Sequence, residues 1–371
     1  MRIIGAIRCV FLALTSLALL ACAGGRSCQA PRGEAASSYR LVGRFDGARF
    51  SWSGSTIRAR FRGPSLAMRL RVPASEEGSP YTVRVDDGAP LTLAIRPERE
   101  RYEVATNLDP ARDHEVTITR EAEAFAGIHE LLGLDLGPGG AFLPDKPRPL
   151  RIEIIGDSIT CGFGVTGDGP ECAFSFDTER ASAAYGAKLG AALDADVTTV
   201  CWSGRGVLRN YDGSTSDTMP ALFELAIPTP ETARWDFGKA PKPDVVIVAL
   251  GTNDFQGGGG QPLDLVAFED AYERFAGRLR EVYPAALVLL STSPMLRHQP
   301  SPAGQGLADD LLRARLEHVV ARRTAAGDRA IELVPVPNEA AHWGCGFHPD
   351  AEMNGRIADR LGAVIRSRLP R

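Results

Sequence analysis

Residues 40–140 carry short runs in which apolar and polar side chains alternate, the pattern of strands with one buried face. Gly, Pro and Asp separate these runs at short intervals, for example at Gly63-Pro64 and Asp86–Gly88. Many short strands with such turn signals predict an antiparallel β-sandwich of the jelly-roll type. The clearest runs are Ile57–Phe61, Leu66–Val72, Tyr81–Val85 and Val116–Thr119.

The pattern changes at Leu150, where continuous apolar runs begin to alternate with stretches of helical periodicity. This alternation predicts a parallel sheet covered by helices on both faces, with any site at the carboxyl ends of the strands. The expected strands are Arg151–Ile155, Val197–Cys201, Val245–Leu250, Leu287–Thr292 and Ile331–Val336. The expected helices are Glu179–Leu193, Leu263–Val282, Leu307–Ala325 and Ala351–Leu369.

The N-terminus has the pattern of an export signal. Arg2 and Arg8 precede an apolar run, Cys9–Leu20, that is too short to span a bilayer comfortably. The run ends in Leu19-Leu20-Ala21-Cys22, which resembles a bacterial lipobox, and that resemblance implies lipid attached at Cys22. The alternatives are an ordinary signal peptide cut near Ala23, or a core helix. We expect an exported protein anchored to a bacterial membrane, on its periplasmic face or at the cell surface.

These features predict four segments: a signal peptide at 1–21, a lipoprotein tether at 22–39, the β-sandwich domain at 40–145 and the α/β domain at 146–371. The tether is rich in Gly, Ser, Arg and Ala, as flexible linkers are. Asp145–Pro149 has the composition of a linker between the two domains. The sequence does not indicate an oligomeric state.

Charge and cysteine spacing narrow the range of partners. The 371 residues carry a net charge of −4, and no basic run with interleaved aromatics is present, so nucleic acid is not expected as a partner. None of the seven cysteines has CxxC spacing, and we expect no metal and no cofactor. Export implies an oxidising compartment in which disulfides persist.

The first candidate for chemistry is Ser158, in the string Ile154–Gly162 just after the first strand of the predicted parallel sheet. A serine there can be presented as a nucleophile, and Gly156 allows a tight turn beside it. If a helix starts at this point, its free N–H groups face any oxyanion formed next to Ser158. The alternative is that Asp157 and Ser158 only cap a helix.

Two further strand ends carry groups that could bind an oxyanion. Asn253, in Leu250–Asp254, could donate from its side-chain amide, although an Asx turn would explain the same residues. Gly204, in Trp202–Gly206, could bring a backbone N–H close to a substrate. Either string alone is a weak signal, because glycine is common in such loops.

His348 lies before the last predicted helix, with Pro349 suited to the first helical turn. A lone histidine at a helix entrance is more often structural. Here, however, separate segments of one fold supply Ser, Gly, Asn and His, a set suited to acyl transfer.

In order along the chain, these four strings resemble the Ser, Gly, Asn and His blocks of SGNH (GDSL-type) hydrolases. The resemblance implies a flavodoxin-like three-layer α/β/α domain that hydrolyses carboxylic esters. It makes Ser158 the nucleophile and His348 its base, and it gives the oxyanion three donors: the N–H of Ser158, the N–H of Gly204 and the side chain of Asn253. The matching strings are Gly156-Asp157-Ser158, Ser203-Gly204, Gly251–Asp254 and His348-Pro349.

A β-sandwich ahead of an SGNH domain is similar to carbohydrate esterase family 2, the acetyl xylan esterases. Members of that family remove acetyl groups from plant polysaccharides such as xylan and glucomannan, and the resemblance implies the same reaction through an acetyl-enzyme. The strings that carry this resemblance are Gly156–Gly162, Cys172–Ser175, Ser203–Gly206 and Arg209–Gly213.

The chain departs from the SGNH pattern before the histidine. These enzymes typically have an Asp three residues before it, and some family 2 members have one two residues before. Cys345 and Gly346 stand at those positions here. We therefore expect a Ser158–His348 dyad in which another acceptor, such as a backbone carbonyl, holds the imidazole.

Aromatic side chains in the same loops suit the apolar faces of sugar rings, although they could equally pack the loops. The substrate-binding candidates are Trp202, Tyr211, Trp343 and Phe347, with Asn210 and Asp212 offering hydrogen bonds to hydroxyl groups.

The alternatives to an acetyl esterase are a lipase or phospholipid esterase, and a carbohydrate-binding lipoprotein without catalysis. A glycosidase would need two carboxylates at a set separation, which a sequence does not test.

After loss of Cys9 with the signal and lipidation of Cys22, five cysteines remain, and we expect Cys28 to be unpaired. At least one disulfide is expected among Cys161, Cys172, Cys201 and Cys345. The favoured pair is Cys161–Cys345, because each lies three residues from a catalytic candidate and a bridge would tie the two loops together.

Overall fold

The computed structural model describes residues 39–74, 79–228, 233–304, 306–338 and 342–369. Cys22, Cys28 and the expected signal and tether up to residue 38 lie outside the described residues. Among the helices within the described residues, none is both long enough and apolar enough to cross a membrane.

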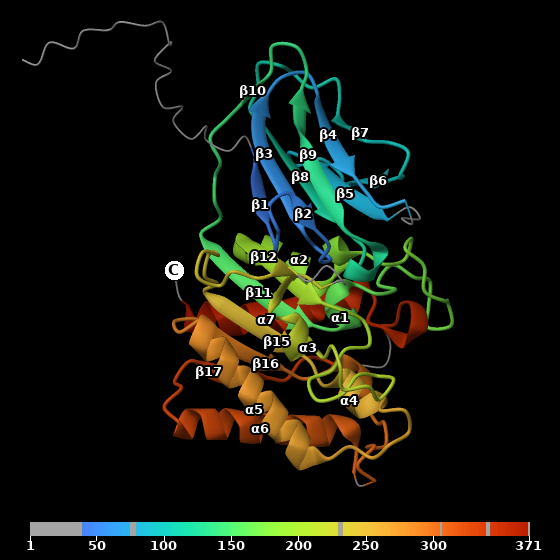
Figure 1. Cartoon of the computed structure of the whole chain (residues 1–371), viewed down its shortest axis with the longest axis vertical. Helices are drawn as coiled ribbons and strands as arrows, with labels where there is room; N and C mark the ends of the chain where they lie inside the picture. The colour runs from blue at the N-terminus through green and yellow to red at the C-terminus, as the bar shows by residue number, and fades with distance from the viewer. Residues whose placement is uncertain (1–38, 75–78, 229–232, 305, 339–341, 370–371) are drawn as a thin grey trace, which may run out of the picture. The chain divides into compact units, whose positions relative to one another are not determined.

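The N-terminal part is a sandwich of two antiparallel sheets (Figure 1). One sheet has the order β1-β3-β8-β5-β6, with β10 also paired to β3, and the other has the order β2-β9-β4-β7. The chain crosses between the sheets repeatedly, as in a jelly roll. The strands are β1 (Arg40–Val42), β2 (Arg49–Phe50), β3 (Thr56–Arg62), β4 (Leu66–Arg71), β5 (Pro80–Val85), β6 (Leu91–Ala94), β7 (Arg101–Ala105), β8 (His114–Arg120), β9 (His129–Leu136) and β10 (Ala141–Phe142).

Alternation along the strands builds the core of the sandwich. In β3, Ile57, Ala59 and Phe61 are buried, whereas the arginines between them are more exposed. The inward residues of both sheets form one apolar cluster that includes Tyr81 and Ile118. The four runs expected from the sequence are therefore core strands.

The second part is a parallel sheet of order β12-β11-β15-β16-β17, the 2-1-3-4-5 order of flavodoxin-like folds (Figure 1). Every neighbouring pair in it is parallel. The strands begin and end within two residues of the expected positions, because continuous apolar runs mark strands buried on both faces. They are β11 (Leu150–Gly156), β12 (Ala195–Cys201), β15 (Val245–Ala249), β16 (Leu287–Ser291) and β17 (Ile331–Val334).

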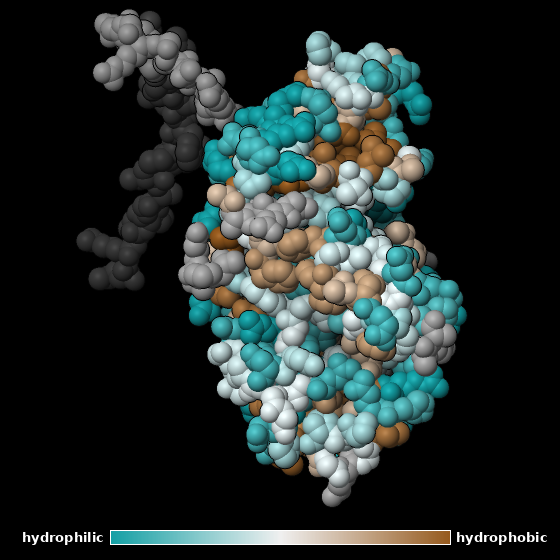
Figure 2. Space-filling model, turned by 90° about the vertical axis from the view of Figure 1, so that its right-hand side faces the viewer, coloured by the Kyte–Doolittle hydropathy of each residue, from teal (hydrophilic) through white to brown (hydrophobic). Residues whose placement is uncertain are grey.

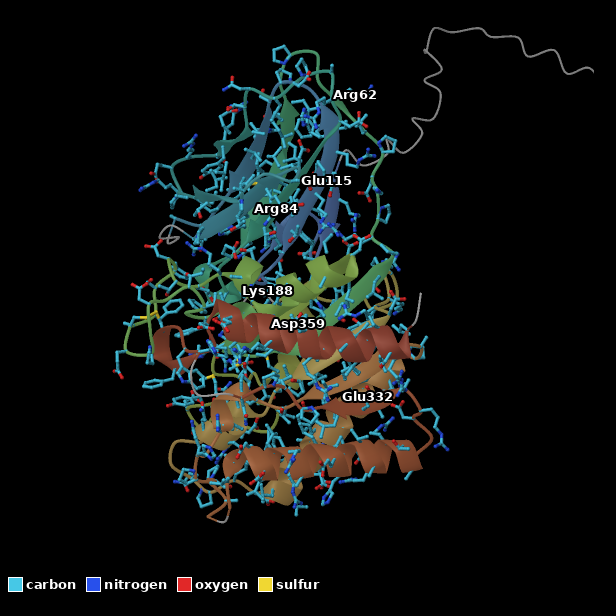
Figure 3. The ribbon with its side chains drawn as sticks, turned by 180° about the vertical axis from the view of Figure 1, so that it is seen from behind. Arg62, Arg84, Glu115, Lys188, Glu332 and Asp359 are labelled. Atoms are coloured by element: carbon cyan, nitrogen blue, oxygen red, sulfur yellow. A yellow bond between two sulfur atoms is a disulfide. The ribbon has the colours of Figure 1, made fainter. Side chains whose placement is uncertain are left out.

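Helices cover both faces of this sheet. In β15, Val246 and Val248 face one apolar cluster, with α5 (Leu265–Val282) and α6 (Ala308–Ala325). Val245 and Ile247 face the opposite cluster. Two helices cover that second face: α2 (Tyr185–Leu193) and α7 (Ala351–Arg368). Figure 3 views these two helices from behind and labels Lys188 on α2 and Asp359 on α7.

One expected helix begins later than its periodicity indicated. The run Glu179–Leu193 forms a short turn, η2 (Ala181–Ala183), and then α2, with Ala184 extended between them. The shorter elements are η1 (Ala124–Ala126), α1 (Ser158–Cys161), α3 (Met219–Leu222), β13 (Leu225–Ile227), β14 (Ala233–Arg234), α4 (Thr252–Gln256), η3 (Pro294–Leu296) and η4 (Cys345–Phe347).

Buried polar contacts join the sandwich to the parallel-sheet domain. The guanidinium of Arg44, which follows β1, donates to the carboxylate of Glu153 on β11 at 3.0 and 2.7 Å. It also donates to the carbonyl of Leu225 at 3.1 Å and lies over the ring of Phe223. Both charged groups are fully or almost fully buried, so the two domains share a desolvated ion pair.

Candidate active site

The strand register brings three of the candidate blocks together. Gly156 pairs with Cys201 on one side and with Ala249 on the other. Two residues beyond these strand ends lie Ser158, Ser203 and Gly251. The N–H of Trp202 also donates to the carbonyl of Gly156 at 3.3 Å. The three loops therefore leave the sheet side by side, at the edge where parallel folds place their sites.

Ser158 is the first residue of the short helix α1, and it is almost fully buried. The preceding Asp157 is the N-cap, and its side chain accepts from the N–H of Ile159 at 3.1 Å. Burial raises the pKa of Asp157 to about 7. Since the Asp157 side chain caps the helix, the hydroxyl of Ser158 is not needed as a cap and can bond another group.

That partner is His348. Its Nε2 lies 2.8 Å from Ser158 Oγ, and its Nδ1 lies 3.0 Å from the carbonyl oxygen of Gly346. Since a carbonyl only accepts, Nδ1 carries the proton, and Nε2 is the acceptor for the serine hydroxyl. Burial lowers the pKa of His348 to about 4, so the ring is neutral at neutral pH and can take that proton.

The histidine loop is fastened to the segment after α1. The N–H of Cys345 donates to the carbonyl of Gly164 at 3.0 Å, and the N–H of Gly346 donates to the carbonyl of Pro170 at 3.0 Å. The ring of Phe163 lies against that of His348, with centroids 4.2 Å apart. Gly346 has φ +60°, a conformation that glycine adopts without steric cost. These contacts fix both the carbonyl and the ring that it orients.

The cysteines pair differently from the favoured expectation. The disulfides are Cys161–Cys201 and Cys172–Cys345, so the expected Cys161–Cys345 bridge is wrong. Cys201 ends the strand beside β11, and α1 carries Cys161 back over that strand end. The histidine loop instead lies against residues 164–172, which brings Cys172 to Cys345. Closeness in sequence to the two catalytic candidates did not determine which sulfurs meet.

Hydrogen bonds join the loop that contains Gly204 to the segment that contains Asn253. The side-chain amide of Asn253 donates to the carbonyl of Arg205 at 2.9 Å, next to Gly204, whose φ of +77° suits glycine. The buried carboxylate of Asp254 accepts from the N–H groups of Val207, Leu208 and Arg209 at 2.8–3.0 Å. The helix after β15 thus holds the loop after β12 in place, and Asn253 keeps a second amide hydrogen for another acceptor.

The aromatic candidates differ in exposure. Tyr211 and Phe347 are 58% and 53% exposed, whereas Trp202 and Trp343 are half-buried. Asp212 is exposed.

The side chain of Asn210, expected to offer hydrogen bonds to a substrate, instead bonds residues of its own loop in this structure. Its side chain accepts from the N–H of Gly206 and donates to Ser214 and Ser216, so Asn210 is buried and occupied in shaping the loop.

Sequence reasoning missed an aromatic cluster beside the histidine. Phe163 stacks on Phe174, with centroids 4.7 Å apart, and Phe174 contacts Phe176. Phe125, from the sandwich domain, lies within 6.3 Å of Phe174, Phe176 and Trp202, measured between ring centroids. Figure 2 views the molecule from the right-hand side of Figure 1 and shows hydrophobic residues gathered on that face. The Phe174-Ser175-Phe176 spacing was the available signal, but nothing local linked it to Phe125.

In the parts of the chain that the structure describes, no cluster of three or more His, Cys, Asp or Glu side chains could hold a metal ion.

Two family models match the chain. Residues 154–356 match the GDSL-like Lipase/Acylhydrolase family, and residues 41–145 match the Carbohydrate esterase 2 N-terminal family. These spans correspond to the parallel-sheet domain and to the sandwich.

Curated relatives match most of the chain. The chain is 30% identical to a cellulase/esterase, CelE, of Acetivibrio thermocellus, over 88% of this chain and 39% of the relative's length. It is 30% identical to an acetylxylan esterase/glucomannan deacetylase of Cellvibrio japonicus, over 67% of each chain. The chain thus spans about two fifths of the length of the first relative and two thirds of the second.

A solved structure agrees with these matches. The family two carbohydrate esterase from Clostridium thermocellum, in complex with cellohexaose, superposes with a TM-score of 0.80 at 29% identity, covering 89% of this chain and 99% of that one. The matches span both domains. This chain therefore belongs to the GDSL-like lipase/acylhydrolase family of ester hydrolases and, within it, to carbohydrate esterase family 2.

Proposed function

We propose that this chain is an acetyl esterase that removes O-acetyl groups from plant polysaccharides such as xylan and glucomannan. The observation that carries the proposal is the hydrogen bond of 2.8 Å between Ser158 Oγ and His348 Nε2, with Nδ1 fixed by the Gly346 carbonyl. The acetylxylan esterase/glucomannan deacetylase relative supports the choice of substrate.

In the proposed mechanism, His348 takes the hydroxyl proton as Ser158 Oγ attacks the acetyl carbonyl. The negative charge on the carbonyl oxygen is held by the N–H of Ser158, the N–H of Gly204 and the side-chain amide of Asn253. His348 then protonates the departing sugar oxygen. Water attacks the acetyl-enzyme in the same way and releases acetate.

The aromatic side chains around the dyad are the proposed contacts for the sugar. Trp202, Tyr211, Trp343 and Phe347 lie in loops that carry the catalytic candidates. Their rings offer apolar faces to a pyranose, and binding energy from the sugar can support reaction at the ester.

The test is acetate release from acetylated xylan and glucomannan, compared with hydrolysis of acetyl and octanoyl esters that lack a sugar. We expect the acetylated oligosaccharide to have the highest kcat/KM. Equal kcat/KM for octanoyl and acetyl esters would instead favour the lipase alternative. Binding of the oligosaccharide without any acetate release would favour the non-catalytic alternative.

We further propose that the protein is exported and lipid-anchored through Cys22, on the basis of the lipobox-like string that ends there. A Cys22→Ala variant should then be recovered from the soluble fraction after export, or accumulate unprocessed. A variant that is still membrane-bound and normally processed would contradict lipidation at this cysteine.

A further inference from the structure

A glutamate of the sandwich domain contacts the loop that carries Gly204. Glu123 lies between β8 and η1 and is fully buried. Its carboxylate accepts from the N–H of Ser203 at 2.6 Å and also from the Ser203 hydroxyl. Ser203 directly precedes Gly204, so this carboxylate holds the residue next to a proposed oxyanion donor. Phe125, two residues further on, contacts Trp202 of the same loop.

A second buried carboxyl lies against the first. Glu179 is also fully buried, and its carboxyl interacts electrostatically with that of Glu123. Burial and the like charge of Glu123 raise the pKa of Glu179 to about 10, and the buried guanidinium of Arg120 faces the pair. Burial also raises the pKa of Glu123, whereas the two hydrogen bonds from Ser203 favour its charged form.

The pair is also connected to the nucleophile. Glu179 is followed by Arg180, whose N–H donates to the carbonyl of Gly162 at 3.0 Å. Gly162 ends α1, and its N–H donates to the carbonyl of Ser158 at 3.1 Å. The two glutamates therefore lie between the loop of Gly204 and the helix of Ser158.

We propose that Glu123 is a positioning residue of the esterase site, which fixes Ser203 so that the next residue presents its N–H to the oxyanion. The proposal rests on the proposed function, because it takes Gly204 as a donor in ester hydrolysis. It makes the sandwich domain part of the reaction's machinery. Without this carboxylate the loop can rotate, and the Gly204 donor is misaligned mainly in the transition state, where the oxyanion forms.

The experiment compares Glu123→Ala and Glu123→Gln with the control Glu121→Ala, using kcat and KM on p-nitrophenyl acetate. Glu121 lies in the same segment and is equally buried, but it accepts from the N–H of Ser182 at 2.8 Å. We expect Glu123→Ala to lower kcat by about 10- to 100-fold with KM changed less than about twofold, as for a damaged oxyanion hole. Glu123→Gln should restore most of kcat, because its amide oxygen can still accept from Ser203. Glu121→Ala should lower thermal stability with kcat within about threefold of wild type.

If Glu123→Ala does not fold, Ser203→Ala removes only the hydroxyl bond to Glu123 and should lower kcat several-fold. The positioning role is wrong if folded Glu123→Ala, or Ser203→Ala in its place, keeps the kcat of the Glu121→Ala control. It is also wrong if the loss in Glu123→Ala lies in KM. A Ser158→Ala variant assayed in parallel separates the two proposals: retained activity there removes the proposed function itself, whereas lost activity with unaffected Glu123 variants removes only the positioning role.

Discussion

At the scale of single residues, the proposed Ser158–His348 dyad has a carbonyl in place of the carboxylate that usually orients a catalytic histidine. Gly346 O fixes the same tautomer as an aspartate would, since it accepts from Nδ1 of His348. It carries no full charge, however, so it stabilises the imidazolium less than an aspartate does. The low pKa of His348, caused by burial, fits a base without a neighbouring carboxylate.

The pH dependence of the reaction follows from this arrangement. The base must be neutral, and burial lowers the pKa of His348 to about 4, so kcat/KM should rise as pH increases through about 4. The measurement is kcat/KM for an acetyl ester from pH 3.5 to 8. A midpoint near the ordinary histidine value of about 6.5 would show that the ring is not desolvated.

Asp157 provides the control for that profile. Burial raises its pKa to about 7, and it lies next to Ser158, so it could add a second inflection. An inflection near pH 7 that disappears in Asp157→Asn belongs to Asp157, whereas the inflection near 4 should persist in that variant. Asparagine still caps a helix, so α1 should remain in place.

At the scale of secondary-structure elements, the disulfide Cys172–Cys345 holds the loop that contains Gly346. The other disulfide, Cys161–Cys201, joins a helix to a strand end, and both of these elements have their own backbone hydrogen bonds. Both bridges should therefore stabilise the fold, but they should affect catalysis differently.

Replacing Cys172 and Cys345 together by alanine should lower kcat by about 10-fold or more, because small displacements of a catalytic group are costly. The matched variant replaces Cys161 and Cys201 by alanine, and its kcat should fall less. Each variant should lose roughly 2–5 kcal/mol in free energy of unfolding, measured by urea denaturation. Equal kcat in the two variants would mean that the hydrogen bonds of Gly346 and Cys345 hold the loop without the disulfide.

Strands and helices could be predicted from the sequence where a single hydrophobic pattern dominates the segment. The apolar run at Val245–Leu250 marked β15 to within one residue, whereas the helix expected from Glu179 begins at Tyr185. Glu179 itself is buried against Glu123, a contact between distant segments that periodicity does not register. The same limit applies to the disulfide pairing and to Asn210, whose partners depend on loop conformation. The strings that contain Ser158 and His348 could be recognised because each occupies a fixed position relative to a predicted element, Ser158 after the first parallel strand and His348 before the last helix.

At the scale of the whole molecule, the sandwich and the parallel-sheet domain share buried polar contacts. Arg44 and Glu153 form an ion pair across the boundary, and Glu123 contacts Ser203 there. These contacts make the sandwich a structural support of the catalytic domain as well as a neighbour in sequence.

An Arg44→Ala substitution leaves Glu153 as an unpaired buried charge, so it should lower the free energy of unfolding by about 3–5 kcal/mol. The control is Arg62→Ala, which breaks an exposed pair with Asp113 and should cost less than about 1 kcal/mol. Thermal and urea unfolding measure both variants. A loss for Arg44→Ala no larger than that for Arg62→Ala would show that the boundary adapts and does not depend on this pair.

The central claim, that Ser158 and His348 act as one catalytic unit on acetyl esters, is tested most directly by acetate release from an acetylated xylo-oligosaccharide. The measurement compares kcat for Ser158→Ala, His348→Ala and the double variant, with folding checked by circular dichroism. We expect each single variant to lose several orders of magnitude and the double variant to lose no more than the worse single one, because the two residues share one step. Retention of more than about a tenth of wild-type kcat in either folded single variant, a barrier change under about 1.4 kcal/mol, would contradict the account.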